Sequence, residues 1–137
     1  MIIICMFVEN LINYIMKIIV YNNTDQYALS RKQIELIKTV LPKEYFDPIK
    51  EFHITPEAPG QEKFEYNYDT KIAYFEYPLK QKTEQTYEDA LFILLTGLCR
   101  IKAKVKFGHY MKKNEIEEYL PFIQNWLQVC LKEIKKT

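Results

Sequence analysis

The sequence predicts an α+β fold, in which a small mixed sheet with a hairpin packs on a central buried helix and further helices follow at the C-terminus. Three observations predict this fold. Residues 86–106 carry apolar side chains at helical spacing around most of the circumference. Short β-branched or alternating segments precede this run, and a second helical pattern follows it. A chain of 137 residues is long enough for one domain with one core.

Composition places the chain among ordinary globular proteins. Hydrophobic residues make up 48% and charged residues 27%, and the net charge is +1. These values exclude a disordered chain, and the bulk charge gives no sign of nucleic-acid binding. The 11 tyrosines indicate a half-buried sheet surface. The three cysteines are odd in number and form no CxxC pair, which favours a reducing, cytoplasmic compartment over a disulfide framework.

The first fifteen residues are considered apart from the domain. Residues 1–8 are apolar, but they lack a basic segment before them and a small-residue cleavage site after them. Eight residues are also too few to span a bilayer. We therefore expect no membrane segment. Residues 1–15 are interpreted as an upstream extension or a flexible arm, with Met16 as an alternative start and 16–137 as the single domain.

Two strands and a helix are expected before the hairpin. Residues 17–21 form a β-branched strand. Ser30 stands three residues before Gln33, a capping box that begins an amphipathic helix, and Pro42 ends that helix. Apolar and polar residues then alternate over 51–55, which predicts a half-buried strand.

The next segment predicts a β-hairpin. Aromatic and polar residues alternate over 64–68, Asp69 and Thr70 supply a turn, and 71–77 returns as the second strand. The polar residues that follow lead into the central helix.

The central helix is expected to begin at Thr86, whose hydroxyl can accept from free amides of the first turn. Gly108 can take the left-handed conformation that ends a helix, and the lysines before it suit the negative end of the helix dipole. Basic and apolar residues alternate over 100–107, so this part also fits a strand with a basic outer face. We prefer the helix.

The C-terminal pattern predicts one more helical region. Apolar residues keep the helical period over 116–134, and Asn114 is a plausible cap. Pro121 interrupts the pattern. Proline removes a backbone hydrogen bond and disfavours helical geometry in the residue before it, so we expect a kink or a break near Leu120.

The middle of the chain resembles the core of the zincin metallopeptidases. The resemblance covers roughly residues 30–101 and consists of a helix, strands including TKIAYFEY, a polar loop, and a helix reading LFILLTGLCRI. In that superfamily a strand runs along the substrate cleft, and the next helix carries the motif HExxH. The five motif positions fall here on Thr96, Gly97, Leu98, Cys99 and Arg100.

The flanks of the motif match the superfamily and the motif itself does not. In HExxH two histidines bind one zinc ion, and the glutamate acts as general base on the bound water. Thr96 and Arg100 occupy the histidine positions here, and Gly97 occupies the glutamate position. Threonine is a poor zinc ligand, arginine is a permanent cation, and glycine cannot accept a proton. The resemblance therefore implies a catalytically inactive member with no cofactor.

Such a member would bind a protein or peptide. An extended partner would join the exposed edge of strand 71–77, which contains Tyr74, and Thr96, Gly97 and Arg100 would line the adjacent groove. Arg100 could hold a carboxylate there. A simpler interpretation of the same helix is that its leucines are core and that Gly97 permits close packing.

Two alternative functions remain open. A metal-dependent hydrolase would need atypical ligands, for which the candidates are His53, Cys99 and His109, although their spacing does not call for a site. Each histidine is more simply a solvated or hydrogen-bonded side chain. No serine or cysteine stands next to a histidine, and the three glycines form no phosphate loop.

A nucleic-acid interface is the second alternative. Basic residues accumulate from Arg100 to Lys113 without an acid, and Phe107 and Tyr110 lie between them. Such a stretch can follow a phosphate backbone while its aromatics stack on bases. The competing interpretation is a solvated helix end whose lysines favour the dipole.

Overall fold

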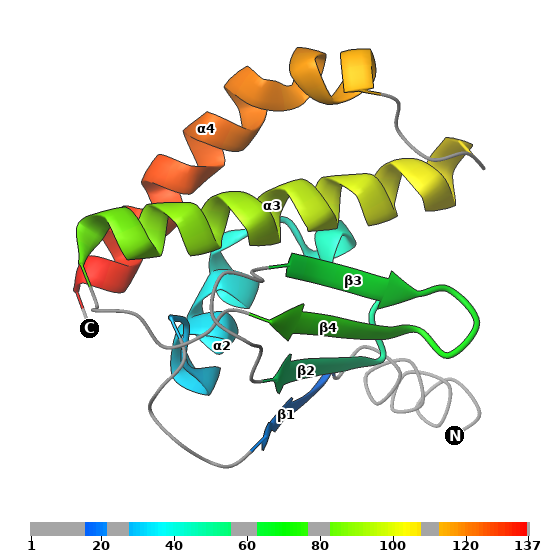
Figure 1. The fold of residues 1–137 in the computed structure, drawn as a ribbon, viewed down its shortest axis with the longest axis horizontal. Helices are drawn as coiled ribbons and strands as arrows, with labels where there is room; N and C mark the ends of the chain where they lie inside the picture. The colour runs from blue at the N-terminus through cyan, green and yellow to red at the C-terminus, as the bar shows by residue number, and fades with distance from the viewer. Residues whose placement is uncertain (1–15, 22–27, 56–62, 77–82, 108–112, 137) are drawn as a thin grey trace, which may run out of the picture.

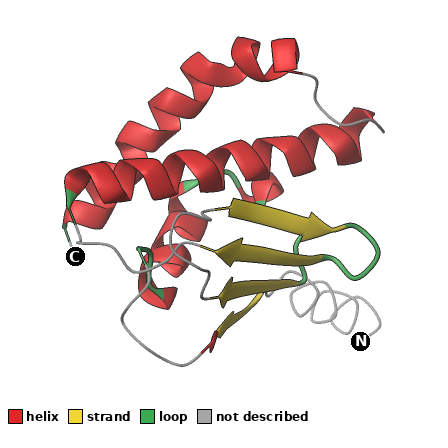
Figure 2. Cartoon of the chain, in the orientation of Figure 1, coloured by secondary structure: helices red, strands yellow, loops and turns green. Residues whose placement is uncertain are grey.

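The computed structural model describes residues 16–21, 28–55, 63–76, 83–107 and 113–136 (Figure 1). The expected extension 1–15 lies outside the described residues. In chain order the elements are β1 (Lys17–Val20), α2 (Arg31–Val40), the 3-10 helix η2 (Lys43–Tyr45), β2 (Glu51–Thr55), β3 (Lys63–Asn67), β4 (Ile72–Glu76), α3 (Glu84–Phe107) and α4 (Lys113–Lys135). A four-stranded mixed sheet with helices packed against it confirms the predicted α+β class (Figure 2). In the described part of the chain, no helix combines the length and apolar character needed to cross a bilayer.

The sheet has the strand order β1-β2-β4-β3. β1 and β4 each pair in parallel with β2, and β3 pairs antiparallel with β4, which confirms the predicted hairpin. β4 is therefore an interior strand, and the prediction that strand 71–77 has an exposed edge is wrong. Its second edge is taken by the parallel pairing with β2. The two edges of the described sheet are β1 and β3.

α2 begins at the predicted capping box. The Gln33 backbone N–H donates to the Ser30 hydroxyl at 3.2 Å, and the Ser30 N–H donates to the Gln33 side-chain oxygen at 2.9 Å. Ile34 and Ile37 are buried one turn further on. Two free amides of the first turn are thus satisfied by local sequence, which fixes where this helix starts.

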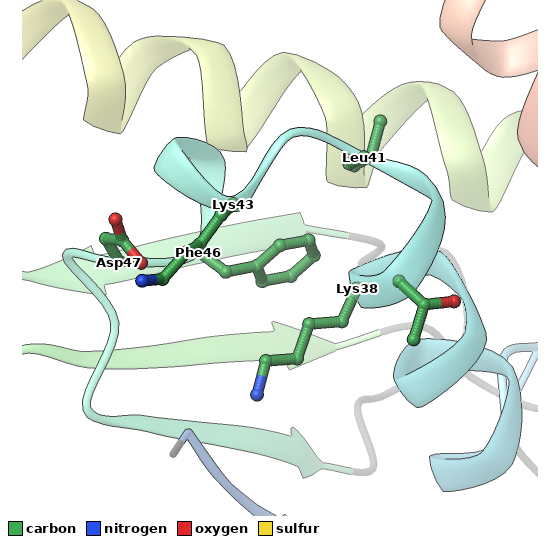
Figure 3. A pocket seen from close by; sticks show the side chains of 6 residues that line it. Lys38, Leu41, Lys43, Phe46 and Asp47 are labelled. Atoms are coloured by element: carbon green, nitrogen blue, oxygen red, sulfur yellow. The ribbon is translucent and has the colours of Figure 1, made fainter. Parts of the chain in front are cut away.

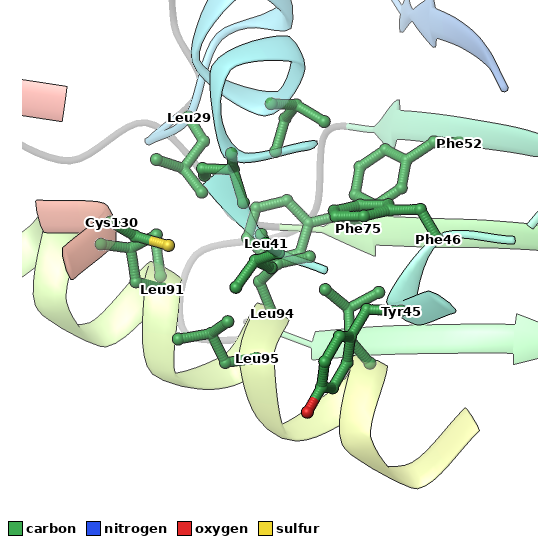
Figure 4. Packing of buried hydrophobic residues seen from close by; sticks show 14 of the residues in the cluster. Leu29, Leu41, Tyr45, Phe46, Phe52, Phe75, Leu91, Leu94, Leu95 and Cys130 are labelled. Atoms are coloured by element: carbon green, nitrogen blue, oxygen red, sulfur yellow. The ribbon is translucent and has the colours of Figure 1, made fainter. Parts of the chain in front are cut away.

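The core lies between the helices and one face of the sheet (Figure 4). Strands β2 and β4 contribute the fully buried Phe52, Ile54, Ala73 and Phe75 to it. α3 contributes Leu91, Leu94, Leu95, Leu98 and Ile101, and α4 contributes Ile123, Leu127, Cys130, Leu131 and Ile134. The leucines of the central helix are core residues, as the simpler interpretation held.

α3 starts one turn earlier than expected. The Thr86 backbone N–H donates to the Thr83 hydroxyl at 3.2 Å, so Thr83 is the capping residue and Thr86 lies buried inside the first turn. Two threonines three residues apart both fit the capping preference, and the sequence pattern did not separate them. The helix then continues to Phe107. The strand alternative for 100–107 is therefore wrong, and Gly108 lies outside the described residues.

The prediction for Leu120 was a kink or a break; α4 is continuous through Pro121, so the break is wrong, and Asn114 lies within the helix. After the proline, Ile123, Leu127 and Leu131 are buried in the core. This packing holds the helix together across the missing hydrogen bond. The axis of α4 changes direction in its N-terminal part (Figure 1), and a proline is an ordinary cause of such a bend.

Candidate functional site

Gly97 of α3 lies against the aromatic ring of Phe64 in β3. A Cβ atom at position 97 would lie 2.1 Å from Cδ1 of Phe64, far inside van der Waals contact. Phe64 itself packs against Phe52 and Phe75, with ring centroids 6.0 and 6.5 Å away. The close approach of α3 to β3 therefore depends on a glycine. A glutamate here, as in HExxH, would have to displace the ring.

Thr96 and Arg100, at the two histidine positions of the motif, lie in different environments. Thr96 is only 8% exposed, and its Oγ1 has no hydrogen-bond partner among the described residues. Arg100 is exposed to solvent. Among the predicted groove residues, Thr96 is thus buried and Arg100 is exposed at the surface.

Tyr74 does not belong to this site. Along β4 the neighbouring Ala73 and Phe75 are buried in the core, and Phe75 pairs with Phe64. Side chains alternate across a strand, so Tyr74 lies on the face of the sheet that points away from the core. The prediction that Tyr74 joins Thr96, Gly97 and Arg100 in one groove is therefore wrong.

The three candidate metal ligands do not come together within the described residues. His53 lies on the same face as Tyr74, whereas Cys99 is buried in α3. Burial raises the pKa of the Cys99 thiol to about 11, although Lys102 opposes the shift. His109 lies outside the described residues. No three His, Cys, Asp or Glu side chains in the part that the structure describes are grouped to hold a metal ion.

A polar cluster that sequence reasoning missed surrounds His53 on this face of the sheet. The Tyr21 hydroxyl lies 3.0 Å from Nδ1 of His53, and Glu51 Oε1 lies 3.3 Å from Nε2. The Tyr74 ring packs edge-on at 5.1 Å. His53 is 8% exposed because the rings of Tyr21 and Tyr74 pack against it, so it is a hydrogen-bonded and not a solvated side chain. The spacing of Glu51 and His53 along one strand was the available signal.

Part of the basic stretch is already used within the fold. Lys102 forms an ion pair with Glu44 at 2.7 Å, and its amine lies 4.5 Å from the centre of the Tyr45 ring. The side chains of Lys106, Lys112 and Lys113 lie outside the described residues. At Lys102 the contacts favour a structural role over a nucleic-acid interface, and nucleic-acid binding stays a prediction.

A surface pocket lies between the end of α2 and η2 (Figure 3). Its volume is about 440 Å³, and Leu41 and Phe46 give it an apolar floor. Lys38, Thr39, Lys43 and Asp47 supply its polar rim. No residue of the motif positions lines it, so it is separate from the α3 and β3 contact.

Comparisons with protein-family models, with curated proteins and with solved structures found no match. Function is therefore inferred from the geometry of the chain itself. The two features that bear on it are the edge strand β3 and the helix α3 beside it.

Proposed function

We propose that this chain is a catalytically inactive, zincin-like domain that binds an extended segment of a partner protein along the outer edge of β3. The observation that carries the proposal is the position of β3. It is an edge strand, paired in the described sheet with β4 alone, and α3 runs beside it (Figure 1). An edge strand can pair with an extended peptide through its backbone.

The absence of a catalytic group at the motif positions supports binding without hydrolysis. The glutamate position of HExxH is Gly97, and the ring of Phe64 fills the space beside it. Neither Thr96 nor Arg100 is a zinc ligand. A water molecule would therefore have neither a metal nor a base at this place on α3.

Arg100 supports a preference for acidic segments. It is exposed on the helix that carries Gly97, one turn beyond the contact with Phe64. A guanidinium at the surface can form two parallel hydrogen bonds with a carboxylate. An acidic side chain or a C-terminal carboxylate of the bound segment is the expected partner.

Hydrogen exchange of the protein with a selected peptide tests the proposal. A random-peptide display library is selected on the full chain, and the best peptide is synthesised with and without N-methylated amides. We expect the plain peptide to slow amide exchange in Lys63–Asn67 and to leave Lys17–Val20 unchanged. N-methylation should abolish the effect, because backbone pairing needs the amide hydrogens.

An arginine variant and a metal assay complete the test. Arg100→Ala should weaken peptide binding about tenfold, whereas Lys32→Ala, on the exposed face of α2, should leave it unchanged. Protection at β1 in place of β3, or full binding of the N-methylated peptide, would contradict strand addition. Stoichiometric zinc in untagged protein would contradict the inactive interpretation.

A further inference from the structure

A row of partly exposed apolar side chains runs along α4, beside the row that faces the core. Tyr119, Phe122 and Val129 are 37%, 39% and 38% exposed, and Trp126 is partly exposed. We name these four residues the α4 stripe. The core-facing residues of α4 are Ile123, Leu127, Cys130, Leu131 and Ile134. Trp126 also packs against the core, and Phe122 stacks on the Tyr45 ring at 6.0 Å, but both side chains stay partly exposed. α4 thus has one apolar side buried in its own core and a neighbouring apolar side that remains partly exposed.

The spacing of the α4 stripe is that of a helix-pairing seam. Its members follow one another at intervals of three, four and three residues, which is the pattern of the two apolar positions in a heptad repeat. Phe122 and Trp126 pack edge-to-face at 6.1 Å, so the stripe is continuous across its middle. A contiguous exposed patch of this kind marks an interaction site more often than single exposed apolar residues do.

The charges on α4 are sorted along its length. No residue from Tyr119 to Leu131 is charged. Glu117 and Glu118 precede this neutral span, and Lys132 follows it; all three are exposed. Lys135 and Lys136 are paired with Glu84 and Glu133, whereas Glu118 and Lys132 form no ion pair within the described residues. An acidic end and a basic end therefore flank the stripe.

We propose that the α4 stripe binds the α4 stripe of a second copy of this chain, with the two helices antiparallel. A two-fold axis near Asn125 would place Phe122 opposite Val129 of the second copy and Trp126 at the centre. The same axis would bring Glu118 next to the second copy's Lys132, twice by symmetry. The inference is independent of peptide binding at β3.

The order of charges along α4 favours a second copy of this chain as the partner, and it favours the antiparallel orientation. In a parallel pair, Glu118 would face Glu118 of the second copy, and Lys132 would face Lys132 of the second copy. Like charges repel, so both ends would be unfavourable. In the antiparallel pair both ends are complementary, and the opposed helix dipoles add to the attraction. Exposed aromatic and aliphatic side chains would then be buried on both chains.

Sedimentation equilibrium of the full chain tests the proposal. We expect a dimer at concentrations on the order of 100 µM. Val129→Glu should convert it to a monomer, because it places two carboxylates in the apolar seam. Gln128→Glu, which adds the same charge at an exposed position outside the stripe, should leave the dimer intact. Thermal unfolding followed by circular dichroism shows that each variant is folded.

A charge exchange tests the direction of pairing. Glu118→Lys and Lys132→Glu should each raise the dissociation constant about tenfold at low salt, and the double variant should restore it to near the original value. A monomeric parent protein, or a dimer unaffected by Val129→Glu, would overturn the proposed surface. Failure of the double variant to restore the dimer would overturn the antiparallel arrangement.

Discussion

The two edges of the sheet are protected to different degrees. At the β1 edge, the Arg31 guanidinium donates to the carbonyl oxygen of Ile18 at 2.8 Å. The backbone N–H of Lys17 donates to the carbonyl oxygen of Lys50, just before β2. Backbone groups alternate in direction along a strand, so those of the next residue, Ile18, point away from β2. Arg31 therefore occupies a site that another strand would need.

At the β3 edge, no side chain of the described residues is bonded to the backbone of Phe64 or Tyr66 in the way that Arg31 is bonded to Ile18. Its ladder with β4 lies on one side, and Phe64 anchors the strand to α3 through Gly97. Unprotected edges favour association with other chains, and proteins usually block them. Within the described residues, a side chain therefore blocks the β1 edge, and the β3 edge carries no such block on Phe64 or Tyr66. Substitutions at Gly97, Arg31 and Thr96 examine this comparison.

The largest effect is expected at Gly97, which sets the distance between α3 and β3. Gly97→Glu should lower the free energy of unfolding by about 3 kcal/mol or more, because it displaces the Phe64 ring and buries a charge. Gly97→Ala should cost about 1–2 kcal/mol, since better helix propensity offsets part of the clash. Urea denaturation measures both values.

A double variant shows whether Phe64 causes this cost. In the presence of Phe64→Ala, the cost of Gly97→Ala should disappear, which corresponds to a coupling free energy of about 1–2 kcal/mol. Additive losses would show that α3 and β3 are not in the contact described.

A smaller effect is expected at the blocked edge. Arg31→Ala should lower stability by about 1 kcal/mol, because the exposed carbonyl of Ile18 exchanges a charged donor for water. It should also increase light scattering at high concentration, since the β1 edge becomes open. Lys32→Ala is the matched control on the same turn of α2. Equal behaviour of the two variants would remove the distinction between the edges.

The smallest effect is expected at Thr96. Thr96→Val should leave stability within about 0.5 kcal/mol or raise it slightly, because the hydroxyl is buried without a partner and valine has nearly the same shape. Thr55→Val is a matched case on β2, where Oγ1 also lacks a partner among the described residues. A loss above about 1 kcal/mol at Thr96 would reveal a hydrogen bond that its hydroxyl makes in solution.

Local signals predicted the elements whose causes are local. The Ser30 and Gln33 capping box begins α2, Pro42 follows its end, and the turn after Asn67 closes the hairpin. The parallel pairing of β2 with β4 joins residues about twenty positions apart, and alternation along a single strand cannot show it. For the same reason, strand 71–77 was predicted to be the exposed edge, whereas β3 is the edge strand of the hairpin.

The candidate site was predicted only in part. The motif positions on α3 are consecutive, so one helix keeps Thr96, Gly97 and Arg100 together. Tyr74 was predicted to lie in the same groove. Strand alternation places its side chain on the opposite face of the sheet from the buried Ala73 and Phe75, and this alternation is visible in the sequence. Thr96 is buried, and Phe64 fills the space beside Gly97. Both facts depend on tertiary packing, which a comparison of motif positions does not include.

The strand order also constrains how the chain can fold during synthesis. β4 is the last of the described strands to leave the ribosome, yet it lies between β2 and β3 in the sheet. β2 therefore has no neighbour on that side until Glu76 has emerged, and the sheet cannot be assembled one strand at a time from its N-terminal end. Nascent chains that end before Ile72 lack β4, so β3 has no partner in the described sheet and only β1 and β2 can pair.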